Sequence, residues 1–168
     1  MDQPIERRTL AVIVDNEPGV LARVVGLFSA RGYNIESLTV AETDRASHQS
    51  RITIVTSGQA IIIDQIKAQL DRIVSVHKVI DVTRDPAGVQ RELALIKVKS
   101  DGQARIEALR VAEIFRAKVI DTTLVSLIFE ITGASEKIDA FTDLMRPLGL
   151  VEVSRTGVLS IQRGAEKG

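Results

Sequence analysis

The 168-residue chain carries the same order of hydrophobic patterns twice, and this repetition limits the folds that it can adopt. In each half, an apolar strand pattern is followed by a helical pattern, two strand patterns, a second helical pattern and a last strand pattern. The string Leu-Phe-Ser-Ala-Arg at residues 27–31 corresponds to Ile-Phe-Arg-Ala-Lys at residues 114–118. The pattern therefore predicts a structural duplication.

A βαββαβ order is typical of the split βαβ motif, in which an antiparallel sheet carries both helices on one face. We therefore expect an α+β protein with two ferredoxin-like domains, the second related to the first. Strands are expected at residues 9–14, 34–43, 51–56, 76–82, 92–98, 119–123, 126–132 and 150–155, and helices at about 19–31, 62–73, 104–116 and 135–145.

The boundary between the two halves is expected near Pro86 and Gly88, in a stretch that lacks apolar periodicity. We predict a first domain at residues 1–83, a linker at 84–90 and a second domain at 91–168. The first domain is expected to bind an effector and to dimerise, for the reasons given below.

The two halves differ in the hairpin between their second and third strands. Nine mostly polar residues, 42–50, separate the strands of the first half, whereas the second half has only a tight turn between Thr123 and Ser126. Because loop excursions often carry function, both a functional role and a mobile polar loop stay open for residues 42–50.

The first strand of each half is apolar on both faces. Leu10, Val12 and Val14 alternate with Ala11 and Ile13, and residues 93–96 repeat this pattern. Helices cover only one face of a split βαβ sheet, so the other face is expected to need a second cover. This favours pairing between domains or subunits, and it predicts a homodimer.

The composition excludes several kinds of site. The sequence has no cysteine, which removes disulfides, thiolate metal ligands and cysteine nucleophiles. Its two histidines are His48, expected to be exposed and inert, and His77, expected to be structural. The 22 basic and 22 acidic side chains balance, so there is no electrostatic footprint for nucleic acid or an anionic membrane.

Motifs for nucleotide binding, zinc proteases and serine hydrolases are absent from the sequence, so no catalytic residue and no metal ligand are predicted. The N-terminal residues lack an apolar signal core, and no apolar run approaches the roughly 20 residues that a membrane span requires. We therefore expect a cytoplasmic protein.

The connection between the first strand and the first helix is the best candidate for a ligand site. It reads Asp-Asn-Glu-Pro-Gly-Val-Leu at residues 15–21. We expect Asn16 or Glu17 near the N-cap, with Pro18 just inside the helix and Gly19 leaving room for a ligand against the backbone. The free N–H groups of a helix N-terminus suit a carboxylate.

A second candidate lies where that helix ends, in Gly-Tyr-Asn-Ile-Glu-Ser at residues 32–37. Asn34 can both donate and accept hydrogen bonds, so it suits the ammonium and carboxylate groups of an amino acid. Taken alone, either segment is also typical of an ordinary turn or helix stop.

Together, the two segments resemble the ACT domain of the regulatory, or small, subunit of acetolactate synthase, also called acetohydroxyacid synthase. The similarity covers residues 15–24 and 27–38 and continues through 51–55, 91–98 and 157–164. The string Gly-Tyr-Asn-Ile-Glu-Ser-Leu is far more specific than the general ACT signature, which many amino-acid-binding regulators share.

The resemblance implies a subunit of branched-chain amino-acid biosynthesis that has no active site of its own. Such a subunit binds the catalytic large subunit, raises its activity and confers feedback inhibition by valine, or by leucine or isoleucine. In that family the effector lies between two ACT domains. The matching effector-binding residues here are Asn16, Gly19, Val20 and Leu21 of one chain, with Asn34 and Ile35 of the other.

The resemblance also implies that thiamine diphosphate, magnesium and FAD belong to the catalytic partner, so no cofactor is expected in this chain. A free-standing amino-acid-sensing ACT module that acts on another partner stays open as an alternative. An autonomous enzyme is disfavoured, because the sequence offers no nucleophile, no credible base and no cofactor motif.

Overall fold

A computed structural model, which describes residues 4–84 and 88–165, divides the chain into two compact units. The first unit contains the chain up to Val89 and the segment that begins at Val158, and the second contains Gln90–Gly157. The segment from Val158 onward, expected in the second domain, therefore groups with the first unit. The expected linker at 84–90 falls in part outside the described residues.

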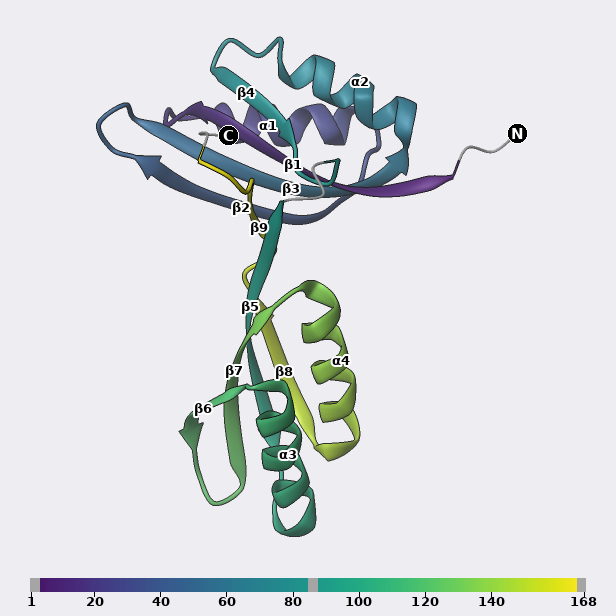
Figure 1. The fold of residues 1–168 in the computed structure, drawn as a ribbon, viewed down its shortest axis with the longest axis vertical. Helices are drawn as coiled ribbons and strands as arrows, with labels where there is room; N and C mark the ends of the chain where they lie inside the picture. The colour runs from purple at the N-terminus through teal and green to yellow at the C-terminus, as the bar shows by residue number, and fades with distance from the viewer. Residues whose placement is uncertain (1–3, 85–87, 166–168) are drawn as a thin grey trace. The chain divides into compact units, whose positions relative to one another are not determined.

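The first unit has the expected βαββαβ order, with its strands in the antiparallel order β2-β3-β1-β4. Figure 1 shows both of its helices on the same side of this sheet. Its elements are β1 (Ile5–Asp15), α1 (Val20–Ala30), β2 (Ile35–Asp44), β3 (Gln49–Gln59), α2 (Ala60–Leu70) and β4 (Val76–Asp81).

The core of the first unit lies between this sheet and its helices. Val20, Val24 and Phe28 recur at every fourth position and form the buried stripe of α1. They pack against alternate residues of β1 and against the isoleucine face of α2. The fully buried members from those elements and from β3 are Leu10, Val12, Ile52, Ile54, Ile63, Ile66 and Leu70.

The second unit repeats the order, with strands arranged β6-β7-β5-β8 and both long helices on one side of the sheet (Figure 1). Phe129 of the sheet and Phe141 of a helix meet edge to face at the centre of its core, with ring centroids 5.7 Å apart. Its elements are β5 (Val89–Lys99), α3 (Gly102–Phe115), β6 (Lys118–Thr122), β7 (Ser126–Gly133), α4 (Ser135–Met145), a 3₁₀ turn (Arg146–Leu148) and β8 (Leu150–Arg155).

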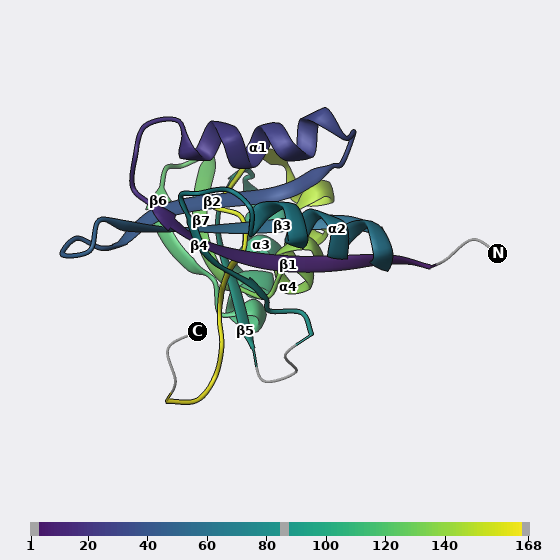
Figure 2. The ribbon, with the colours of Figure 1, turned by 90° about the horizontal axis from the view of Figure 1, so that it is seen from above.

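The expected polar loop at residues 42–50 is mostly strand, so that prediction is wrong. Glu42 pairs with Ser50, and Asp44 pairs with Gln49, which leaves only residues 45–48 as the turn. The backbone hydrogen bonds of a solvated hairpin form whether or not its side chains are apolar. The polar side chains of residues 42–50 therefore did not mark the ends of β2 and β3. In Figures 1 and 2 this hairpin extends past the other strands of its sheet.

The C-terminal segment covers part of the face of the first sheet that points away from the helices. The Val158 N–H donates to Ser37 Oγ at 2.9 Å, and Thr39 Oγ1 donates to the Val158 carbonyl at 3.4 Å. The short strand β9 (Leu159–Ile161) follows. The expected cover of the sheet face that lacks helices thus comes in part from the C-terminal segment of the same chain. The homodimer stays a prediction.

Across the described ranges, no helix has the length and apolar character that a membrane span needs. The same residues contain no cluster of three or more His, Asp or Glu side chains that is placed to hold a metal ion.

Candidate functional site

The connection from β1 to α1 is shaped by a glycine. Gly19 has φ +87°, a left-handed conformation that side chains disfavour, and the helix begins at the next residue. A Cβ at Gly19 would meet no atom of the described residues within 4 Å, so the backbone conformation, and not crowding, requires glycine here.

The expected cap at Asn16 or Glu17 is wrong, because α1 has no side-chain cap hydrogen bond and Pro18 precedes the helix. The Glu17 carbonyl instead accepts the Val20 N–H at 3.4 Å, which closes a turn before the helix starts. This turn places Asn16 and Glu17 too far back along the chain to cap the first helical turn.

Two backbone donors stay open at the start of α1. The Arg23 N–H reaches the Gly19 carbonyl at 3.1 Å, but the N–H groups of Leu21 and Ala22 have no acceptor within the described residues. No acidic side chain lies in this first turn. Such a helix end attracts an anion such as a carboxylate.

The tip of the β2–β3 hairpin holds the same connection in place. The Asn16 N–H donates to the His48 carbonyl at 2.7 Å, and Asn16 Nδ2 donates to Glu42 Oε1 at 3.3 Å. Neither Glu42 nor the carbonyl of His48 was singled out from the sequence, because their proximity depends on the length of the hairpin.

His77 also fastens this corner of the unit. Its Nε2 lies 2.5 Å from Asp15 Oδ1, which joins β4 to the end of β1 immediately before Asn16. This contact lies at the surface, since 45 % of the His77 side chain is exposed, and the structural role of His77 stays a prediction.

The connection from α1 to β2 begins with Gly32, whose φ of +66° ends the helix as the sequence predicts. The Tyr33 N–H then reaches back to the Phe28 carbonyl at 3.0 Å. Asn34 is exposed; its carbonyl accepts from Thr56 Oγ1 at 2.6 Å, and its side-chain amide has no partner among the described residues.

An ionised carboxylate follows Asn34 closely on β2. Glu36 accepts hydrogen bonds from Ser57 Oγ and from Arg7 Nε, and these hydrogen bonds hold its pKa below the usual range. The charge of Arg7 offsets that of Glu36, so an amino acid beside Asn34 meets a neutralised pair and not an isolated negative charge.

The six expected effector residues lie in two groups, at opposite ends of α1. A helix of 11 residues is about 16 Å long, so one chain does not bring Asn16 and Asn34 to a common ligand. Within the first group, Val20 is buried in its own core while Leu21 is 40 % exposed. Ile35 opens β2 and is half-buried. Leu21, and not Val20, therefore offers an apolar side chain to a ligand.

Comparison with protein families covers both units. Residues 10–78 match the model described as the AHAS small subunit-like ACT domain, and residues 91–164 match that of the small subunit of acetolactate synthase. The chain belongs to the acetolactate synthase small-subunit family. This membership places it in branched-chain amino-acid biosynthesis and confirms the family indicated by the two loops.

Individual members of the acetolactate synthase small-subunit family match along nearly their whole length. The probable small subunit of Archaeoglobus fulgidus is 45% identical over 161 residues, which is 96% of this chain and 99% of that protein. The isozyme 3 small subunit of Escherichia coli is 45% identical over 94% of this chain and 96% of its own. The crystal structure of the Thermotoga maritima small subunit superposes with a TM-score of 0.86 at 38% identity, over 96% of this chain and 99% of that one.

Proposed function

We propose that this chain is the regulatory subunit of an acetolactate synthase: it binds the catalytic large subunit, raises its activity and makes that activity sensitive to valine. The observation that carries the proposal is the pair of open polar groups at the two ends of α1, in a chain that matches small subunits throughout. The chain itself then has no active site, and thiamine diphosphate, magnesium and FAD belong to the partner.

In this proposal, two chains complete one effector site. The carboxylate of valine accepts hydrogen bonds from the Leu21 and Ala22 N–H groups of one protomer, beside Gly19 and Asn16. Asn34 of the other protomer, whose amide is open, contacts the ammonium and carboxylate groups. Leu21 and Ile35 supply apolar contact for the branched side chain, and leucine or isoleucine would make the same polar contacts.

Inhibition requires that valine bind two states of the complex with different affinity, because equal binding shifts no equilibrium. The hydrogen bonds of Asn16 to the hairpin tip and of β2 to Val158 link the effector residues to the hairpin and to the C-terminal segment. These elements are the candidates for carrying the effect of valine to the large subunit.

The direct test mixes the purified chain with its cognate large subunit and measures acetolactate formation with and without valine. We expect higher activity on addition of the chain and loss of that gain as valine is added. If the chain changes neither the activity nor the response to valine, the proposed function is wrong.

The site itself is tested by Asn16→Ala and Asn34→Ala, each of which should remove valine inhibition and leave activation largely intact. The exposed amide of Gln65 on α2 provides a control, since Gln65→Ala changes neither property. Loss of activation in either asparagine variant would show that effector binding and docking use the same surface.

A mixture of the two variants separates a shared site from a site within one chain. A dimer of one Asn16→Ala chain and one Asn34→Ala chain keeps both asparagines intact at one of its two sites. Random pairing makes about half of the dimers mixed, so mixing equal amounts should restore valine binding, measured by calorimetry, to about a quarter of a site per chain. If each chain bound valine by itself, mixing would restore nothing.

A further inference from the structure

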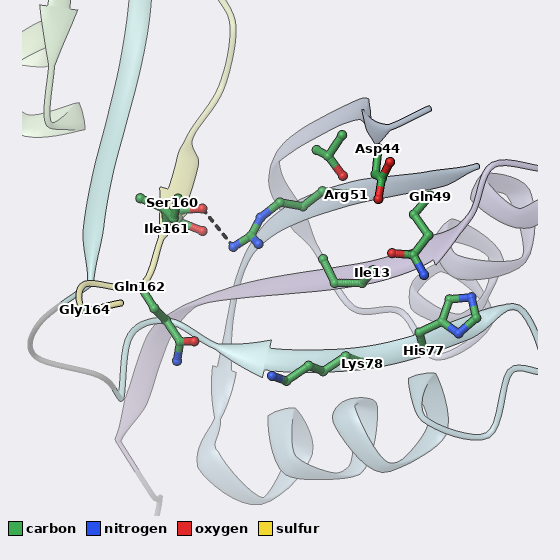
Figure 3. A pocket seen from close by; sticks show the side chains of 11 residues that line it. Ile13, Asp44, Gln49, Arg51, His77, Lys78, Ser160, Ile161, Gln162 and Gly164 are labelled. Atoms are coloured by element: carbon green, nitrogen blue, oxygen red, sulfur yellow. Dashed lines mark hydrogen bonds between the residues drawn. The ribbon is translucent and has the colours of Figure 1, made fainter. Parts of the chain in front are cut away.

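An open pocket of about 570 Å³ lies on the face of the first sheet that points away from its helices (Figure 3). Ile13, Arg51 and Lys78, from three neighbouring strands, form its floor, and the C-terminal segment faces Arg51 from one side. All of its lining residues belong to the first unit.

Two buried polar atoms of this pocket have no hydrogen-bond partner among the described residues: Arg51 Nε and Ser160 Oγ. The two residues are adjacent, since Arg51 Nη2 donates to the Ser160 carbonyl at 2.9 Å, drawn as a dashed line in Figure 3. Ser160 is only 8 % exposed. Buried donors are rarely left open in folded proteins, so two of them in one pocket indicate a missing acceptor.

The charges around the pocket favour an anion as that acceptor. The positively charged residues Arg51 and Lys78 line the pocket, and Asp44 lines it on the side of the hairpin. His77 is a further lining residue, and its ring contacts Asp15. No salt bridge joins Arg51 to a carboxylate within the described ranges, and burial lowers the pKa of its guanidinium because the charge is partly withdrawn from water. An oxyanion at Arg51 would offset this loss of hydration.

We propose that this pocket binds the oxyanion group of a small metabolite, a carboxylate or a phosphate, with Arg51 Nε and Ser160 Oγ as its donors. Lys78 adds positive charge to the floor of the pocket, and Gln49 and Gln162 also line it. The pocket is distinct from the effector residues at the ends of α1, so this proposal goes beyond the regulation by valine and does not depend on it.

Calorimetric titration of the full chain with inorganic phosphate and, separately, with acetate tests the proposal at constant ionic strength. Saturable binding of at least one of them, at one site per chain and with a dissociation constant in the millimolar range or below, is the expected result. Preference for phosphate identifies a phosphate-bearing ligand, and preference for acetate or equal binding identifies a carboxylate or a general oxyanion. Saturation by neither anion would overturn the proposal.

Variants assign any such binding to this pocket. Arg51→Gln should weaken it at least about tenfold and Ser160→Ala about threefold, because each removes one donor. Arg72→Gln, at an exposed arginine outside the pocket, is the matched control and should bind as the parent does.

Folding of each variant is checked by circular dichroism. If Arg51→Gln does not fold, Ser160→Ala and the surface change Lys78→Gln carry the test, and unchanged binding in both refutes the proposal. The titration needs neither valine nor the large subunit, so its failure would leave the proposed regulatory function untouched.

Discussion

Each of the two units holds an ion pair with a buried carboxylate at the same place in the fold, and the charges of the two pairs are exchanged. In the first unit Arg8 on β1 donates from Nη1 to Asp81 Oδ2 at 2.8 Å. In the second, Arg155 on β8 donates from Nε and Nη2 to both oxygens of Glu92 on β5, at 2.6 and 2.8 Å.

The registers of the strands place the two pairs in corresponding positions. Asp81 lies opposite Leu10, and Arg155 lies opposite Ala94, so in each unit the central-strand partner sits two residues before that position. The comparison teaches that both units place complementary charges at this corner, although the strand that carries the positive charge differs.

The largest expected effect comes from removing the cation of either pair. Arg8→Met should lower the unfolding free energy by about 2–3 kcal/mol, because buried Asp81 is left with a longer ion-pair contact, 3.7 Å to Arg84 Nε. Arg155→Met should cost about 2 kcal/mol, since water reaches a third of that side chain and screens the pair.

Denaturant unfolding can follow the two units separately. The single tyrosine, Tyr33, reports on the first unit through its fluorescence, and hydrogen exchange with mass spectrometry locates losses in the second. The exposed pair of Arg110 with Glu107 is the control, and Arg110→Met should change stability by less than about 0.5 kcal/mol. A cost as small as that for both Arg8→Met and Arg155→Met would show that the pairs contribute nothing.

The second unit should lose stability in acid through Glu92. Hydrogen bonds from Arg155 hold the pKa of Glu92 below its ordinary value of 4.5, although burial opposes this. A lowered folded-state pKa means that the contribution is complete above the unfolded value and is lost as the pH falls below about 4.5 toward the folded value. Unfolding measured from pH 6 to pH 3 in Arg155→Met should show a smaller slope than in the parent chain.

Exchanging the charges in the second unit tests whether its geometry alone matters. Glu92→Arg places two arginines together and should destabilise the unit, whereas adding Arg155→Asp recreates the arrangement of the first unit. We expect the double variant to regain at least about 1 kcal/mol over the single one in a double-mutant cycle. Additive losses would mean that the two corners are not interchangeable.

Alanine substitutions of the glycines at the starts of α1 and α3 should give the smallest loss of stability, and only one of them should affect valine binding. Gly19 and Gly102 both have positive φ, +87° and +49°, and a Cβ built on either would meet no atom within 4 Å in the part of the chain that the structure describes. Alanine at either position should therefore cost about 1 kcal/mol through backbone strain alone. Only Gly19→Ala should also weaken valine binding, measured by calorimetry; equal weakening by Gly102→Ala would place the effector elsewhere.

Local patterns in the sequence predict the elements well where side chains are buried. α4 and β8 begin and end at the expected residues, because apolar periodicity and flanking turn residues mark both ends. The prediction of a loop at residues 42–50 was wrong, because the strands of the β2–β3 hairpin are solvated there and their backbone pairing leaves no apolar pattern in the sequence.

Features that depend on register between distant strands were not predicted. The pair of Arg8 with Asp81 joins residues 73 positions apart, and Arg51 meets the Ser160 carbonyl across 109 positions. The candidate effector residues were found from short strings, which already placed a helix between Asn16 and Asn34, but the burial of Val20 in its own core became clear only in the structure. Composition and spacing predict the local structure of a segment, whereas its contacts with distant segments depend on the fold.

The return of the C-terminal segment to the first sheet affects how the chain is made. The polypeptide leaves the first unit, builds the second and then comes back, so the second unit is inserted within the first. During synthesis, all four strands of the first sheet are made before the second unit and before Val158. The face of this sheet that points away from its helices therefore stays uncovered by the C-terminal segment while the whole second unit is made. The apolar residues on that face are thus open to solvent, or to other proteins, until the ribosome has nearly finished the described chain.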